Sequence, residues 1–181
     1  GDCVISTGKT RHELETAEYN ILQEQRRSPY GAASLLFYCE VVCMCGIAGF
    51  CNFQENFLYE RDRWQHVLVE MREAIAHRGP DQTGEYLRET VGLSHARLSI
   101  RDLSGGAQPL LRRAKGAEYG IVYNGEVYNT GELTADLIQR GYRFETTSDT
   151  EVVLYAYMEY GPAFVTMLNG IFAFAIWDGD R

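Results

Sequence analysis

The sequence predicts a layered domain built from α-helices and β-strands. Apolar residues recur at helical spacing in some stretches and as short strand-like runs in others, and the two kinds alternate in groups. Glycine and proline mark the breaks between them. The chain of 181 residues is 45% hydrophobic and 23% charged, so it can bury the core of one such domain.

The predicted strands are short apolar or alternating segments. Residues 45–53 form a compact, largely apolar run that is typical of a buried strand. Three more strands are predicted at 85–88, 91–96 and 119–123, with turn residues between them. Residues 171–177 are almost wholly apolar, as expected of a strand that is covered on both faces.

Two predicted helices are followed by residues that break helices. Residues 60–77 carry apolar side chains at helical spacing and stop at Arg78-Gly79-Pro80. Residues 130–140 predict a second helix, which Gly141 closes.

A third helix is predicted from its first turn. Ser148 to Glu151 has the spacing of a capping box, in which the serine and the glutamate satisfy each other's backbone amides. This helix should begin near Asp149 and run to Tyr160, and Gly161-Pro162 should end it.

The two ends of the chain are less regular. Residues 1–43 carry no recognisable motif, although the charged, glutamine-rich stretch 11–27 predicts a helix. Three origins fit this segment: a propeptide that is removed, untranslated upstream sequence, or part of a fused neighbour.

At the other end, Asp178-Gly179 predicts a tight hairpin turn, and the strand before it needs a returning partner. Because the chain stops at Arg181, we expect a fragment that is cut inside a folded domain.

Composition narrows the classes of function. The formal net charge of −8 argues against a nucleic-acid partner and favours small-molecule chemistry. The five cysteines form no pair of CxxC motifs, so we expect neither a disulfide framework nor a zinc ribbon, and a reducing cytoplasm fits. No apolar stretch reaches the roughly 20 residues of a membrane span, so no membrane partner is expected. His77 and His95 have no carboxylate or cysteine at ligand spacing, which predicts structural roles and no metal site.

The segment MCGIAGF, Met44 to Phe50, places a cysteine directly after a methionine. If the mature chain begins at Cys45, one residue carries both a thiol and a free α-amine. An α-amine has a pKa of about 7.7 to 8.0 and can accept the thiol proton near neutral pH. The thiolate can then attack an amide carbonyl, which a neutral thiol does not. The alternative is that Cys45 is a small buried side chain at the start of a strand.

Seven segments of the chain form a recognisable series. They are MCGIAGF at 44–50, HRGPDQTG at 77–84, LSHARLSI at 93–100, GAQPL at 106–110, YNGEVYN at 123–129, SDTEV at 148–152 and LNGIFAFAIWD at 168–178. In this order they resemble the glutaminase domain of the glutamine-hydrolysing asparagine synthetases, a branch of the class II glutamine amidotransferases. The resemblance covers Cys45 to Arg181, and nothing before Met44 matches.

The resemblance implies which residues act. Cys45 would attack the side-chain amide of glutamine, expel ammonia and leave a glutamyl thioester that water hydrolyses, with its own amine as the base. Asn124 and Gly125 would form the oxyanion hole. The implied substrate-binding residues are Arg97 for the α-carboxylate, the backbone of Leu98, Ser99, Ile100 and Arg101 beside it, Glu126 and Asp149 for the α-ammonium, and Asn124 and Gly125.

The same residues also fit simpler interpretations. Asn124-Gly125 has the sequence of a tight hairpin turn, and Asp149 fits a helix cap beside Ser148. Arg97 fits a surface cation on a strand, and Glu126 fits a solvated acid. Residues 1–43, if they remain attached, would block the amine of Cys45.

The resemblance also implies the fold and the wider reaction. The expected fold is α+β, a four-layer αββα sandwich of the amino-terminal-nucleophile hydrolase type, truncated at its C-terminal end. The glutaminase domain needs no cofactor. ATP and magnesium belong to a synthetase domain beyond Arg181, which passes ammonia to activated aspartate. The partners implied are L-glutamine and that synthetase domain, in the cytoplasm, and a full-length homodimer is compatible with the resemblance.

Two alternatives for the function stay open. One is a class II amidotransferase with another ammonia acceptor, such as a sugar phosphate, phosphoribosyl pyrophosphate or a different carboxylate. The other is a catalytically silent relative that binds glutamine. Labelling of Cys45 by an electrophilic glutamine analogue would distinguish the silent relative from an enzyme.

Overall fold

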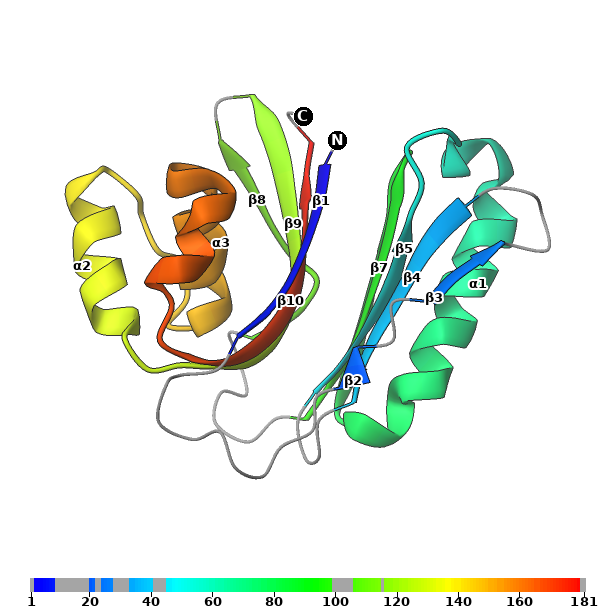
Figure 1. Cartoon of the computed structure of the whole chain (residues 1–181), viewed down its shortest axis with the longest axis horizontal. Helices are drawn as coiled ribbons and strands as arrows, with labels where there is room; N and C mark the ends of the chain where they lie inside the picture. The colour runs from blue at the N-terminus through cyan, green and yellow to red at the C-terminus, as the bar shows by residue number, and fades with distance from the viewer. Residues whose placement is uncertain are drawn as a thin grey trace.

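The computed structural model describes residues 2–8, 20–21, 24–27, 33–40, 45–98, 106–114 and 116–179, and it describes side chains from residue 45 onwards. Within these residues two antiparallel sheets face each other, and helices cover their outer faces (Figure 1). Helices α2 (Thr130–Gln139) and α3 (Asp149–Tyr160) lie on one side, and α1 (Arg61–Ile75) lies on the other (Figure 1). The predicted α+β fold with the layer order αββα is confirmed.

The first sheet lies under α2 and α3. Its strands follow the order β1 (Asp2–Gly8), β10 (Gly170–Asp178), β9 (Ala117–Val127) and β8 (Leu110–Ala114). All three pairings are antiparallel. β9 therefore lies inside the sheet and is paired on both sides.

The second sheet lies against α1. Its strands follow the order β2 (Asn20–Ile21), β4 (Ala33–Glu40), β5 (Gly46–Cys51), β7 (Val91–Arg97) and β6 (Gln82–Leu87), and β3 (Glu24–Arg27) also pairs with β4. β5 therefore lies between β4 and β7, both antiparallel to it, and Cys45 stands directly before its first residue.

Strand β10 shows how one apolar strand serves two cores. Phe172, Phe174 and Ile176 pack into the core beneath α2 and α3, whereas Ala173, Ala175 and Trp177 belong to the core between the sheets. Successive side chains of a strand point to opposite faces, so both faces of β10 are covered, as its composition predicts. The two alanines are small, which suits the close approach of the facing sheet.

Short 3₁₀ helices extend or join the longer helices. η1 (Phe57–Glu60) precedes α1, η2 (Ala76–Arg78) follows it, and η3 (Gly161–Met167) follows α3. The predicted helices at 60–77, 130–140 and 149–160 are thus confirmed to within a few residues. No helix in the described part of the chain is long and apolar enough to cross a membrane.

Two expectations about the fold are wrong, and strand β8 was not expected. The helix predicted at 11–27 is not formed in its described parts, because residues 20–21 and 24–27 pair with β4 as strands, and its remainder lies outside the described residues. β10 does not lack a second neighbour, because β1 pairs along it. β8 was not predicted, since its sequence LLRRA shows no apolar alternation. The hairpin turn predicted at Asp178-Gly179 involves residues 180–181, which lie outside the described residues.

Glu118 links the two sheets at the opposite end of β9 from Asn124. Its carboxylate accepts hydrogen bonds from the Tyr86 hydroxyl on β6 and from the guanidinium groups of Arg88 and Arg113. The bond from Tyr86 is the main reason that the pKa of Glu118 falls from 4.5 to about 2. Glu118 therefore stays ionised in the folded chain over a wider pH range than in the unfolded chain.

We expect this link to make the fold sensitive to acid. Because the pKa of Glu118 is lower in the folded state, its stabilisation is complete above about pH 4.5 and is lost as the pH falls through about 2. Arg113 is 79% exposed, so water screens part of the attraction and we expect about 1 to 2 kcal/mol. Urea unfolding of Glu118→Gln should show this loss near neutral pH and a shrinking difference from wild type below about pH 4. The control is Glu89→Gln at an exposed glutamate, and a pH-independent difference for Glu118→Gln would contradict the assignment.

Candidate active site

A cavity of about 670 Å³ lies where β5 begins and β9 ends. Strands β7 and β9 and the N-termini of α2 and α3 contribute to its wall, and Cys45, directly before β5, also lines it. It brings together seven of the ten residues that the sequence predicts for the site: Cys45, Arg97, Leu98, Asn124, Gly125, Glu126 and Asp149. The other three, Ser99, Ile100 and Arg101, lie outside the described residues.

Cys45 is half-buried, and its sulfur meets the end of β7. The backbone N–H of Leu98 donates to Sγ at 3.4 Å, and the thiol can donate to the Leu98 carbonyl at 3.8 Å. An N–H donor stabilises negative charge on sulfur, so this contact suits a thiolate. Cys51 is the other cysteine with a described side chain, and it is buried in the core between the sheets. Of these two thiols, only Cys45 lines the cavity.

Asn124 and Gly125 lie inside β9, opposite Ala173 and Phe172, and form no hairpin turn. The Asn124 side chain is 3% exposed, and its Oδ1 is buried without a hydrogen-bond partner. Gly125 has a φ of +154°, and a Cβ at this position would lie 2.3 Å from the carbonyl oxygen of Ile171. Only glycine fits there, so the sheet holds an amide side chain and a bare backbone unit side by side at the cavity.

Arg97 is the last residue of β7 and is 8% exposed. Its Nη1 donates to Gln82 Oε1 at 2.9 Å. The guanidinium also lies against the backbone of Gly106, where a Cβ would come within 2.5 Å of Nη2. Packing therefore fixes the orientation of the Arg97 guanidinium. Because the side chain is buried, the alternative of a solvated surface arginine does not fit.

Asp149 is the first residue of α3 and faces the end of β9. Its Oδ2 accepts a hydrogen bond from the Tyr123 hydroxyl at 2.8 Å and from the Val127 N–H at 3.3 Å. Burial is the main reason that the pKa of Asp149 is raised, and burial together with Asp149 raises the pKa of Tyr123. Glu126, the second predicted acid, lines the same cavity but is exposed.

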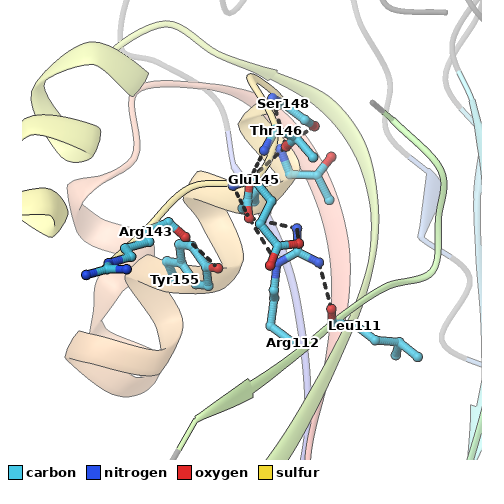
Figure 2. Close-up of polar contacts among 9 residues, drawn as sticks. Leu111, Arg112, Arg143, Glu145, Thr146, Ser148 and Tyr155 are labelled. Carbon is cyan, nitrogen blue, oxygen red and sulfur yellow. Dashed lines mark hydrogen bonds and ion pairs between the residues drawn. The ribbon is translucent and has the colours of Figure 1, made fainter. Parts of the chain in front are cut away.

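Ser148 caps α3, as its sequence predicts. Its Oγ accepts a hydrogen bond from the Thr150 N–H at 3.1 Å. The reciprocal half of the predicted capping box is wrong, because the Ser148 N–H donates to Thr146 Oγ1 and Glu151 turns toward Arg112 instead (Figure 2). A guanidinium offers a carboxylate a stronger, two-pronged partner than a backbone amide does.

Two residues of the cavity wall carry contacts that the sequence does not predict. Tyr123 holds Asp149, as described above, and Gln108 joins β9 to α3. Gln108 Oε1 accepts from the Tyr123 N–H at 2.6 Å, and its Nε2 donates to Thr150 Oγ1 at 3.4 Å. Gln108 lies in GAQPL and Tyr123 in YNGEVYN, two of the segments that carry the family resemblance. Their place in these segments is the sequence signal that could have identified them. Their contacts depend on the pairing of distant segments, which a local pattern does not contain.

His95 and the other candidate ligands give no metal site in the described residues. His95 is 1% exposed on β7, and burial lowers its pKa to about 4, so the imidazole is neutral near pH 7. No group of three histidine, cysteine, aspartate or glutamate side chains within the described ranges could hold a metal ion.

Comparison with known proteins finds a match over most of the chain. Residues 44–181 match the glutamine amidotransferase domain family. Asparagine synthetase (glutamine-hydrolyzing) 3 of Bacillus subtilis is 43% identical over 138 residues, which are 76% of this chain and 22% of that protein. Asparagine synthetase B of Escherichia coli is 39% identical over 138 residues, which are 76% of this chain and 24% of that protein. The chain thus spans less than a quarter of the length of these relatives.

Solved structures give a further comparison. The glutamine phosphoribosylpyrophosphate amidotransferase of B. subtilis, in complex with ADP and GMP, is 27% identical to the part of the chain that it matches. The match covers 50% of this chain and 22% of that chain, with a TM-score of 0.43.

Proposed function

Because the chain belongs to the glutamine amidotransferase domain family, we propose that it hydrolyses L-glutamine to glutamate and ammonia with Cys45 as the nucleophile. The observation that carries this proposal is the composition of one cavity. A thiol, a buried guanidinium, a buried amide and two carboxylates line it together. These groups complement an α-amino acid whose side chain ends in an amide.

The proposed recognition rests on the two ends of the α-amino acid. The Arg97 guanidinium offers parallel donors to the α-carboxylate. Asp149 and Glu126 offer acceptors to the α-ammonium. Burial raises the pKa of Asp149, so an ammonium ion in contact with it would supply the positive partner that an ionised carboxylate needs in that position.

The proposed reaction begins when the free α-amine of Cys45 takes the thiol proton. The thiolate forms a C–S bond to the side-chain amide carbon, and the carbonyl oxygen becomes negative. The Asn124 side-chain NH₂ and the Gly125 N–H donate to that oxygen. The C–N bond then breaks, and the amine returns its proton to the leaving ammonia. Water hydrolyses the glutamyl thioester, releases glutamate and restores the thiol.

The test is the state of the bond between residues 44 and 45. We expect mass spectrometry of the purified protein to show Cys45 as the first residue of the active fraction, and that fraction to release equal amounts of ammonia and glutamate. A fraction in which the bond is intact should release neither, because its Cys45 nitrogen is an amide and cannot act as the base. Release at full rate from the intact chain would overturn the proposal. A fraction that begins at Cys45 and binds glutamine without hydrolysing it would identify a silent relative.

We further propose that the ammonia serves the synthesis of asparagine. The curated relatives described above are named asparagine synthetases, and this chain spans less than a quarter of their length. In this proposal ATP and magnesium serve a synthetase domain of the full-length protein, in the cytoplasm, and take no part in the chemistry at Cys45. The free thiol of Cys45 is compatible with that reducing location. An assay of the full-length protein with aspartate, ATP and glutamine tests the acceptor.

A further inference from the structure

A buried carboxylate that takes no part in the proposed chemistry lies directly behind Asp149. Glu151, in the first turn of α3, is 0% exposed and is not among the residues that line the cavity. Its Oε1 accepts hydrogen bonds from Arg112 Nε at 2.9 Å and Nη2 at 2.7 Å. Its Oε2 accepts from both the N–H and the hydroxyl of Thr146 at 2.7 Å. Figure 2 shows Arg112 on β8 and Thr146 in the segment that precedes α3, and both bond to Glu151 on α3.

Both carboxylate oxygens of Glu151 accept several hydrogen bonds. The Glu145 N–H lies 3.2 Å from each of its carboxylate oxygens. Burial by itself would raise the pKa of Glu151, but the hydrogen bonds from Thr146 and Arg112 outweigh burial and keep that pKa below its usual value. A buried charge with this many donors is an ordered group, and the loss of one donor leaves part of it unpaired.

The same contacts hold the segment 143–148, which leads into α3. Glu151 binds it at Glu145 and Thr146, and the Tyr155 hydroxyl donates to the Arg143 carbonyl at 3.2 Å (Figure 2). Thr146 Oγ1 donates to Glu151 and accepts from the Ser148 N–H at 3.2 Å. A continuous series of hydrogen bonds therefore runs from the Arg112 guanidinium to the backbone immediately before Asp149.

We propose that Glu151, together with Arg112 and Thr146, is a positioning group for substrate recognition: it holds the segment before α3 so that Asp149 meets the α-ammonium of glutamine. This inference rests on the proposed function. Glu151 acts through Asp149 and touches neither the substrate nor the reacting atoms. Its loss therefore affects the binding of glutamine more than the attack by Cys45.

The sharpest test is Thr146→Val, which keeps the size of the side chain and the Arg112–Glu151 ion pair but removes the hydroxyl. We expect the KM for glutamine to rise about tenfold, while kcat stays within about twofold. Glu151→Gln should raise KM further, although it also lowers stability because Arg112 loses its buried charged partner and keeps only the exposed Glu145. The matched control is Glu159→Gln on the same helix, where Glu159 accepts from Arg140 at 3.1 Å and Tyr142 at 3.3 Å away from the cavity. That variant should leave KM unchanged.

A double-mutant cycle separates positioning from general loosening of the fold. In an Asp149→Asn background, Thr146→Val should change kcat/KM by less than about twofold, because the group that it positions is already lost. A tenfold effect that persists in that background, or a fall in kcat at constant KM, would overturn the inference. If the wild type releases no ammonia, the proposed function fails separately, and the same cycle is measured on the Kd of L-glutamine by calorimetry. Failure to bind glutamine overturns both proposals.

Discussion

A Cys45→Ala substitution is expected to abolish glutamine hydrolysis and to lower the rate of ammonia release by about 10⁴-fold or more. The reason is chemical: without the sulfur no C–S bond forms, so no thioester can divide the reaction into two easier steps. The rest of the cavity keeps Arg97, Asp149 and Asn124, so the variant should still bind glutamine. Ammonia release measures the first effect, and calorimetric titration with glutamine measures the second.

The matched control is Cys51, the second cysteine with a described side chain. Cys51→Ala removes a thiol from the core between the sheets, away from the cavity, so it should retain its activity and its reaction with an electrophilic glutamine analogue. Cys45→Ala should lose both. Equal labelling of Cys45→Ala and wild type would show that the reactive group lies elsewhere, and the assignment of the nucleophile would fail.

An Asn124→Ala substitution is expected to lower kcat by about 100-fold to 1,000-fold with little change in KM. The side-chain amide is 3% exposed and lines the cavity beside Gly125. Its NH₂ gains most when the substrate oxygen becomes negative, so its loss affects the transition state more than the bound ground state.

Steady-state kinetics with glutamine distinguish this role from simple binding. Asn124→Asp keeps the shape but places a negative charge against the developing oxyanion, so it should be at least as damaging as alanine. Asn129→Ala is the control, because that side chain bonds Met167 and Asn169 outside the cavity. A rise in KM at unchanged kcat for Asn124→Ala would assign the residue to ground-state binding instead.

The fold could be predicted where local patterns and burial agree. The segment 171–177 is apolar on both faces, and β10 is covered by helices on one side and by the second sheet on the other. β8 pairs with β9, which follows it directly, but its sequence LLRRA shows no apolar alternation. β1 could not be predicted in this way, because its strand character arises from pairing with β10, far away in sequence. The failed helix at 11–27 has the same cause, since pairing with β4 overrides local propensity in its described parts.

The residues of the site could be predicted better than the contacts that hold them. Asn124-Gly125 alone is equally typical of a turn, and its place inside β9 becomes clear only from the pairing with β10. Glu151 fitted a capping box because the sequence shows its spacing from Ser148 but not the buried Arg112 that competes for it. The roles of Cys45, Arg97, Glu126 and Asp149 stay predictions, and the experiments above address those of Cys45 and Asp149.

The alternation of side chains along β9 has a consequence for inherited variation. Tyr123 lies on the helical face and reaches Asp149, whereas Asn124 lies on the same face as Val122, toward the second sheet. The loss of a single codon just upstream would exchange these two faces and carry the amide into the helical core. Such a chain would retain almost every amino acid, but its Asn124 side chain would no longer point toward the second sheet. Functional alleles of this strand should therefore differ by replacement, and length changes should occur only in the loops beyond it.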